Sequence, residues 1–371
     1  HSFQASRWDY KYTGGDATGG LTGLKGKRVG IIGTGATSVQ CVPALGESAE
    51  HLTVFQRTPS SIDVKNNPLT DSTWADSLKP GWHQHRMDNF NALVSGVPQA
   101  EDLVADGWTD LIGKLLIGLQ QEGAGDMSPE GIMRAVELAD FEKMEEIRAR
   151  VESLVADPQT AEALKPYYRQ FCKRPCFHNE YLETFNRANV TLVDTQGRGV
   201  DRITENGVSV GGQEYELDCL IYATGFEVGT DYSHRADIQL LGRDGVSLTD
   251  AWADGVRTLH GMHVNGFPNC FVMSNAQAGF TANYPHLLDE QAKHIAYIIQ
   301  AAAERGHSRI EVTQEGESTW VQRCIDKARD TGDFLENCTP GYYNNEGRTG
   351  DRSAQDGFYG GGSIEVFRLL S

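Results

Sequence analysis

The clearest chemical signal in this sequence is a tight glycine turn. Gly33, Thr34 and Gly35 follow a short apolar run, and small and apolar residues begin at Ala36. Such a turn brings backbone amides close to a pyrophosphate, whose charge the amino terminus of the following helix stabilises. We therefore predict a dinucleotide site here, and its further fingerprint residues are Thr37, Ser38 and Gln40. Ser38 stands where the motif usually has a third glycine, and a small side chain still suits that helix-packing position.

A second signal lies at the end of the next apolar run, Leu52 to Gln56. Arg57 and Thr58 occupy the place where an NAD-binding protein has an acid for the ribose 2′-hydroxyl. Because an arginine at this place favours a 2′-phosphate, we predict NADPH rather than NADH as the cofactor. The alternative is that Arg57 is a solvated residue at a strand end.

The elements that must position these residues alternate between strands and helices. Residues 25–64 predict a strand, the glycine turn, a helix and a second strand. Further strands are predicted at Val190–Asp194 and Cys219–Ala223, and a hairpin that turns at two glycines is predicted at Val208–Tyr215. The fold class is therefore α/β, with a Rossmann-like NADPH-binding domain formed by residues 25–64 and 166–225.

The rest of the chain predicts three further parts. Residues 1–24 are irregular and suit a surface connector, residues 65–165 show helical periodicity and form a helical insertion, and residues 226–371 form a second α/β part. The predicted helices are Trp108–Gln121, Pro129–Leu138, Phe141–Val155, Leu287–Ala303 and Thr319–Arg329. One more strand is predicted at Cys270–Met273.

Composition excludes several classes of function. The chain has 371 residues, enough for two or three domains, and a net charge of −18, which argues against nucleic acid or an anionic membrane as partner. No apolar segment is long enough to span a bilayer, so we expect a cytoplasmic protein. Seven cysteines without a C-x-x-C pair predict reduced thiols, and no metal site is expected because Cys172, Cys176, His83 and His85 lack partners at ligand spacing.

Several motifs together resemble the flavin-dependent Baeyer–Villiger monooxygenases. The stretches that carry the resemblance are GTGATSVQ, TVFQRTP, FCKRPCFHNEYLETFNRANVTLVD and LIYATGFE. The resemblance implies FAD and NADPH as cofactors, and a small-molecule ketone and O2 as substrates. One oxygen atom would be inserted beside the ketone carbonyl to yield an ester or lactone.

The same resemblance implies roles for individual residues. Arg174 would supply the positive charge beside the anionic oxidant, because arginine stays protonated at every working pH. Lys173 would be a second contact to the 2′-phosphate, and the loop near flavin and substrate would contain Asn275, Gln277, Gly279 and Phe280. The alternatives are surface ion pairs for the two cations and an ordinary surface loop.

The opening residues are similar to the tail of the family fingerprint. Trp8 and Asp9 match it, whereas the fingerprint histidine falls at Gln4, which can hydrogen-bond but cannot carry a positive charge. Residues 226–371 would be the carboxyl-terminal part of an FAD-binding domain. A second glycine fingerprint is absent from the sequence, so we expect this chain on its own to be flavin-free and inactive.

Two other functions stay open at this point. One is a flavin monooxygenase that acts on amine or sulfide centres and shares the two-nucleotide layout. The other is a non-catalytic NADP-binding fragment. No pattern in the sequence specifies the particular ketone or an oligomeric state.

Overall fold

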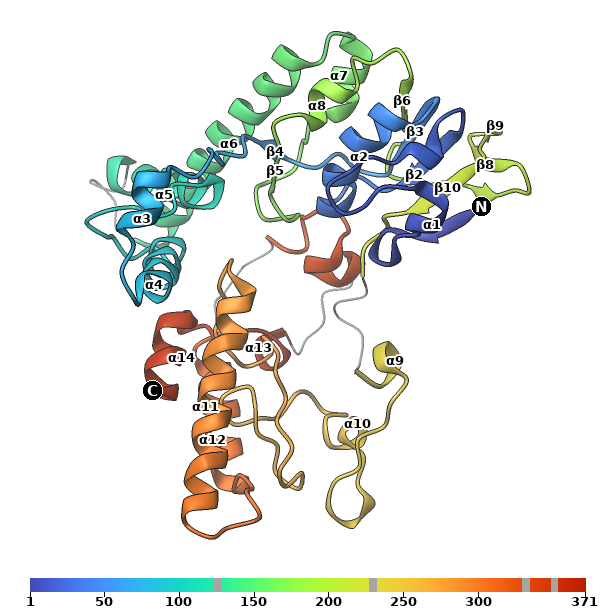
Figure 1. The fold of residues 1–371 in the computed structure, drawn as a ribbon. Coiled ribbons are helices and arrows are strands. Elements are labelled where there is room, and N and C mark those ends of the chain that lie inside the picture. The colour runs from blue at the N-terminus through green and yellow to red at the C-terminus, as the bar shows by residue number, and fades with distance from the viewer. Residues whose placement is uncertain (123–127, 227–231, 329–333, 348–352) are drawn as a thin grey trace. The chain divides into compact units, whose positions relative to one another are not determined.

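A computed structural model describes residues 1–122, 128–226, 232–328, 334–347 and 353–371 (Figure 1). The chain forms two compact units. Unit 1 comprises residues 1–67, 117–226 and 338–343, and unit 2 comprises residues 68–116, 227–337 and 344–371. Each unit is therefore built from segments that are distant in the sequence.

Unit 1 is built on a parallel sheet of five strands in the order β1-β10-β2-β3-β6. Along the chain these strands are β1 (Ser2–Gln4), β2 (Arg28–Ile32), β3 (His51–Gln56), β6 (Val190–Asp194) and β10 (Cys219–Tyr222). The chain passes from β2 to β3 and β6 in one direction, and β10 then lies on the other side of β2. In open α/β sheets such a reversal of strand order marks the place where ligands bind, which here is at the carboxyl ends of β2 and β10.

Both faces of this sheet are covered. Val29, Ile31, Leu52 and Val54 share one buried cluster with residues of α2 (Ala36–Ser48). The alternate positions, such as Phe55 and Leu220, share a second cluster with the small antiparallel sheet of β7 (Arg202–Ile203), β8 (Gly207–Val210) and β9 (Gln213–Glu216). Figure 1 shows α2 beside β2 and β3. The alternation follows from the two-residue period of a strand, and the α/β class predicted above is confirmed.

The remaining elements of unit 1 are short, apart from one long helix. They are η1 (Ala5–Arg7), α1 (Tyr10–Thr13), η2 (Thr22–Leu24), β4 (Ile62–Asp63), α6 (Pro129–Leu154), α7 (Pro158–Leu164), β5 (Cys176–Phe177) and α8 (Tyr181–Thr184). The prediction of two helices between Pro129 and Val155 is wrong, because α6 is continuous. No glycine or proline interrupts it after Gly131, and the buried Asp140 carboxylate accepts a hydrogen bond from the Gln170 amide at 2.7 Å.

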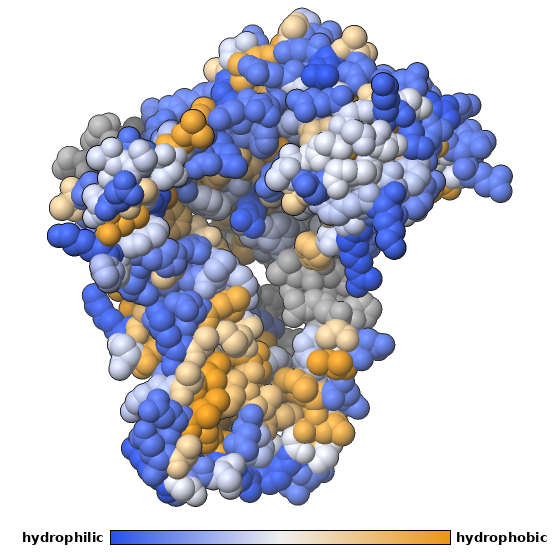
Figure 2. Space-filling view, in the orientation of Figure 1, coloured by the Kyte–Doolittle hydropathy of each residue, from blue (hydrophilic) through white to orange (hydrophobic). Residues whose placement is uncertain are grey.

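Unit 2 is mainly helical in the part of the chain that the structure describes. Its elements are α3 (Ser72–Ser77), α4 (Trp82–Val94), α9 (Tyr232–Ala236), η3 (Arg243–Gly245), α10 (Leu248–Ala251), α11 (Tyr284–Glu304), α12 (Gln314–Asp326), α13 (Ser353–Asp356) and α14 (Gly362–Leu370), while α5 (Gly107–Glu122) and η4 (Tyr342–Gly347) contain residues of both units. Its main buried cluster includes Met262, Trp320, Tyr359 and Val366. Figure 2 shows apolar side chains gathered over α11 on the face in view.

Three predictions about elements need correction. Cys270–Met273 is not a strand, because Phe271 makes a single bridge to His263 and a strand needs a ladder of partners. The helix predicted at Thr319 begins at Gln314, where the Thr313 hydroxyl accepts a hydrogen bond from the Gly316 amide at 3.1 Å. The opening residues contain β1, which the connector prediction missed.

The prediction that all cysteines are reduced is wrong for one pair. Cys172 and Cys338 form a disulfide with an S–S distance of 2.04 Å, although 166 positions separate them in the sequence. Such a pairing depends on the fold and leaves no local pattern. The free thiols are Cys41, Cys176, Cys219, Cys270 and Cys324.

Two features are absent from the residues that the structure describes. None of the helices in the described ranges is long and apolar enough to cross a membrane. No group of three or more His, Cys, Asp or Glu side chains in those ranges could hold a metal ion.

Two histidines of unit 2 should make the stability of this unit depend on pH. Burial, together with the smaller effect of the nearby His294, lowers the pKa of His260 and of His263 from 6.5 to about 4. Between these values the unfolded chain binds protons that the folded unit does not, so the free energy of unfolding should fall as pH falls from 6.5 towards 4.

Urea unfolding followed by tryptophan fluorescence across this pH range tests the expectation. His263→Gln should flatten the pH dependence, whereas the exposed His307→Gln should leave the slope as it is in the parent chain. A parent stability that stays constant from pH 6.5 to 4 would contradict the assignment of neutral, buried imidazoles.

Candidate functional site

The candidate site lies at the carboxyl edge of the parallel sheet in unit 1. Gly33 follows β2 with a φ of 110°, a left-handed conformation that favours glycine. A Cβ at this position would stand 2.4 Å from the carbonyl oxygen of Ala223, which follows β10. The turn therefore needs glycine both for its backbone and for the close approach of the segment that follows β10.

The surroundings of Gly35 differ from those of Gly33. It is the N-cap residue of α2, and a Cβ there would meet no atom within 4 Å. The space beside the first amides of α2 is therefore open to a ligand, and those amides carry the partial positive charge of the helix amino terminus. Ser38 is fully buried one turn further along. Ala36 and Thr37 begin the helix, and the Gln40 side chain donates to the Ala36 carbonyl at 3.0 Å.

Two hydroxyl groups join the glycine turn to the segment after β3. The Thr34 hydroxyl donates to the Thr58 carbonyl at 2.8 Å, and the Ser60 hydroxyl donates to the Thr34 carbonyl at 2.6 Å. Both side chains are buried. Thr58 is therefore held beside the turn, as the sequence interpretation requires.

Arg57 and Lys173 meet at a single acceptor. The Arg57 guanidinium donates to the carbonyl oxygen of Pro340 at 3.3 Å, and the Lys173 ammonium donates to the same oxygen at 3.2 Å. Two cations from different segments are thus gathered beside the end of β3. The arrangement suits a doubly charged anion such as a ribose 2′-phosphate.

Arg174 lies next to this pair, exposed to solvent. Burial raises the pKa of the Cys176 thiol to about 11, and the positive charge of Arg174 opposes that rise. Burial likewise raises the pKa of the Tyr343 hydroxyl, and Arg174 again opposes the shift. The Arg174 charge therefore acts on both Cys176 and Tyr343.

Sequence reasoning missed two groups that position this edge. The first is Tyr168, whose hydroxyl accepts from the Ser61 amide and donates to the Pro59 carbonyl, both at 2.9 Å. Burial raises the pKa of this hydroxyl, so it stays protonated and can donate. The second is the segment Cys338–Tyr343, which supplies Pro340. Neither group lies near the glycine motif in the sequence, and no local signal marks them.

The connector residues have structural contacts in unit 1. Gln4 ends β1 opposite Tyr222 and is exposed at the carboxyl edge of the sheet. The Trp8 ring packs edge-on against Phe3 with a centroid distance of 5.3 Å, and its indole donates to the Thr13 hydroxyl at 3.0 Å. The Asp9 carboxylate caps α1. Of these three residues, Gln4 lies at the carboxyl edge of the sheet, where the glycine turn begins.

The four loop residues named from the resemblance lie in unit 2. Gln277 is fully buried: its amide oxygen accepts from the backbone and hydroxyl of Thr258, and its amide nitrogen donates to the Val256 and Gln355 carbonyls. Gly279 is a close-packing position, where a Cβ would stand 2.5 Å from the Cα of Ser363. The other two are Asn275, half-buried, and Phe280, which is 48% exposed.

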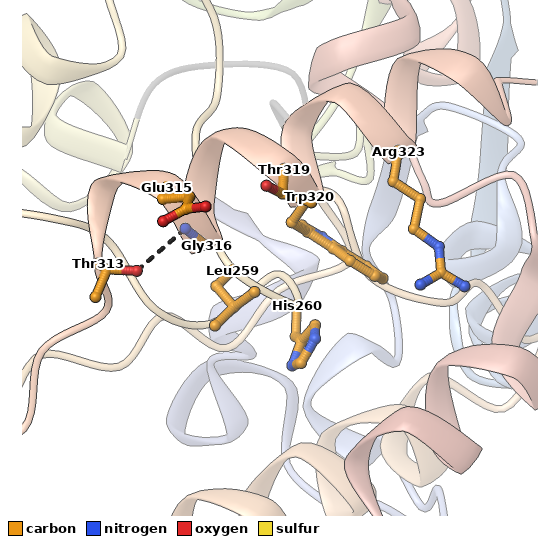
Figure 3. A pocket seen from close by; sticks show the side chains of 8 residues that line it. All are labelled: Leu259, His260, Thr313, Glu315, Gly316, Thr319, Trp320 and Arg323. Atoms are coloured by element: carbon orange, nitrogen blue, oxygen red, sulfur yellow. Dashed lines mark hydrogen bonds between the residues drawn. The ribbon is translucent and has the colours of Figure 1, made fainter.

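Unit 2 also has a hollow of about 410 Å³ (Figure 3). Its lining residues are Leu259, His260, Thr313, Glu315, Gly316, Thr319, Trp320 and Arg323. Arg323 donates to the Tyr359 hydroxyl and to the Glu365 carboxylate, so its charge is already paired, and burial keeps His260 neutral. We assign no reaction to this hollow.

No protein-family model matches the chain. Among curated proteins, neopentalenolactone D synthase from Streptomyces avermitilis is 55% identical over 372 aligned positions, which cover all of this chain and 62% of that protein. A Baeyer–Villiger monooxygenase from Streptomyces coelicolor is 50% identical over 353 positions, which cover 94% of this chain and 58% of that protein. The chain therefore spans about three fifths of the length of these relatives.

Solved structures agree with the sequence relatives. The polycyclic ketone monooxygenase of the fungus Thermothelomyces thermophila matches with a TM-score of 0.88 and 38% identity, over all of this chain and 61% of that one. A steroid monooxygenase bound to NADP matches with a TM-score of 0.70 and 27% identity, over 94% of this chain and 65% of that one. The resemblance inferred from the motifs is thereby confirmed: over its whole length the chain is similar to flavin-dependent Baeyer–Villiger monooxygenases.

Proposed function

We propose that the natural protein containing this chain is an NADPH- and FAD-dependent monooxygenase that inserts one oxygen atom of O2 beside the carbonyl of a small-molecule ketone. The observation that carries the proposal is the meeting of Arg57 and Lys173 beside an open glycine turn. Similarity to this family supplies the reaction class. The names of the relatives favour a ketone over an amine or sulfide centre, and activity on those centres is the alternative.

NADP would be held by residues of unit 1. The first amides of α2, beside Gly35, would bind the pyrophosphate, because a Cβ at Gly35 would meet nothing within 4 Å. Arg57, Thr58 and Lys173 would bind the 2′-phosphate. Residues 25–64 and 166–225 would then form the NADPH-binding domain, with residues 65–165 inserted in it and residues 1–24 connecting to it.

When bound, NADPH would supply the hydride and FAD the oxygen-activating chemistry of this reaction. Within this chain, Arg174 would provide a fixed positive charge where negative charge develops at the reacting oxygen atoms. Its guanidinium suits the role because it stays protonated and offers several donors in one plane. Pro175, which follows it, restricts the backbone of this segment.

Unit 2 would contribute to the flavin and substrate side. Residues 226–371 would be the carboxyl-terminal part of an FAD-binding domain. Phe280 and Phe358 lie in ring contact at 4.5 Å and are 48% and 46% exposed, so they offer apolar surface to a flat ring or an apolar ketone. Gln277 and Gly279 would shape this loop from within, and Asn275 would face the ligand. Location in the cytoplasm stays a prediction of the sequence.

The first prediction concerns the choice of cofactor. Arg57→Ala should weaken NADPH binding roughly 10- to 100-fold while sparing NADH, because it removes a charge-assisted hydrogen bond of about 1.5–3 kcal/mol to the 2′-phosphate alone. Isothermal titration of the chain with each cofactor measures both affinities. The exposed Arg202→Ala, on β7, removes a like charge elsewhere in unit 1 and should change neither affinity. Equal binding of NADPH and NADH by the parent would contradict the proposal.

The second prediction concerns Arg174. In the natural protein that contains this chain, Arg174→Ala should lower the rate of ester formation on the order of 10²- to 10³-fold, because a preorganised charge is lost from the reaction. Arg174→Lys should recover little, since an ammonium lacks the planar fork.

Gas chromatography of the ester product, beside titration with NADPH, separates catalysis from binding. NADPH affinity should stay within a few-fold of the parent, and Arg202→Ala should keep full activity. Normal ester formation by Arg174→Ala would reassign this residue to a structural role.

A further inference from the structure

The disulfide of unit 1 lies directly beside the two cations. Cys172 precedes Lys173 in the chain, and Cys338 lies two residues before Pro340, whose carbonyl accepts from both Lys173 and Arg57. The two sulfur-bearing residues are 3% and 6% exposed. A buried covalent bond therefore ties the acceptor segment to the segment that carries one of the cations.

The shared carbonyl has a clear electrostatic effect. Two like charges repel each other, and an oxygen with partial negative charge between them offsets that repulsion. The Lys173 ammonium and the Arg57 guanidinium each donate a hydrogen bond to this oxygen. The cations are thus already gathered before an anion arrives.

We propose that the Cys172–Cys338 disulfide is a positioning element for the 2′-phosphate site: it holds the Pro340 carbonyl where it orients Arg57 and Lys173. The inference rests on the proposed use of NADP. The disulfide touches no cofactor in this scheme and acts through the two cations. Its effect is therefore confined to ligands that carry a 2′-phosphate.

The physical reason is preorganisation. Long cationic side chains lose rotamer freedom when they bind an anion, and a site that has already restricted them binds more tightly. Without the disulfide the Cys338–Tyr343 segment has fewer ties to unit 1, and each cation must be ordered by the ligand. Reduction breaks the S–S bond and yields two thiols; a dithiol reductant supplies the two electrons and two protons and closes its own disulfide.

Two adenine nucleotides that differ by the 2′-phosphate isolate this effect. Adenosine 2′,5′-bisphosphate carries the group and adenosine 5′-monophosphate lacks it. For Cys338→Ser, isothermal titration should show adenosine 2′,5′-bisphosphate bound roughly 5- to 20-fold more weakly, the loss expected when one or two side chains are no longer pre-ordered. The affinity for adenosine 5′-monophosphate should not change. Cys41→Ser, at a free cysteine of α2, is the matched control.

The parent chain treated with a dithiol reductant provides a second measurement that needs no substitution. Mass spectrometry after alkylation counts the thiols, and the same two nucleotides are titrated. The expected result is again a selective loss for the 2′-phosphate ligand. Should Cys338→Ser fail to fold, this measurement decides the matter alone.

Three results would overturn the inference. The first is an unchanged affinity for adenosine 2′,5′-bisphosphate. The second is a tighter affinity for this nucleotide, which would make the Pro340 carbonyl a competitor of the phosphate. The third is an equal loss of affinity for both nucleotides, which would mean general destabilisation. Failure of the proposed NADP use is distinguishable, because the untreated parent chain would then bind the two nucleotides equally. That result removes the basis of the inference as well.

Discussion

Parallel pairing in register is the constraint on which the site of unit 1 depends. Gln4 pairs with Tyr222, Tyr222 with Ile32, and Ile32 with Phe55, so these four strands end at the same level. In a parallel sheet the carboxyl ends share one edge. The glycine turn and the cation at the end of β3 become neighbours for this reason, although a whole helix separates them in the chain. A change of register in one strand would separate them.

The local parts of this arrangement could be predicted from the sequence. β2, α2 and β3 follow each other within 30 residues. They are marked by apolar runs, by the glycine turn and by Arg57 in the place of an acid. The parts that could not be predicted are nonlocal. β1 has three residues and too little pattern to be recognised as a strand, and its pairing with β10 joins residues more than 200 positions apart. The prediction at Cys270–Met273 failed for the converse reason, because an apolar run with only a single bridge is not a strand.

The site shows the same division. Gly33, Gly35 and Thr34 lie where the motif requires them, and the contacts of Gly33 and Thr34 explain their residue types. The Pro340 carbonyl and the Tyr168 hydroxyl are equally part of the geometry, yet proline and tyrosine in a loop have no spacing rule that reveals such a role. Gln277 illustrates the opposite case: its place in a motif suggests contact with a ligand, whereas its amide is used in full by neighbouring backbone and hydroxyl groups.

The short strand β1 has a practical consequence for anyone who modifies this protein. An edge strand shields the unpaired amides and carbonyls of its neighbour, and β1 does this for one side of β10. Any tag or fusion partner joined at His1 must therefore leave Ser2–Gln4 extended and in place. A linker that pulled these residues away would leave β10 as a bare edge strand, ready to pair with the same strand of another molecule.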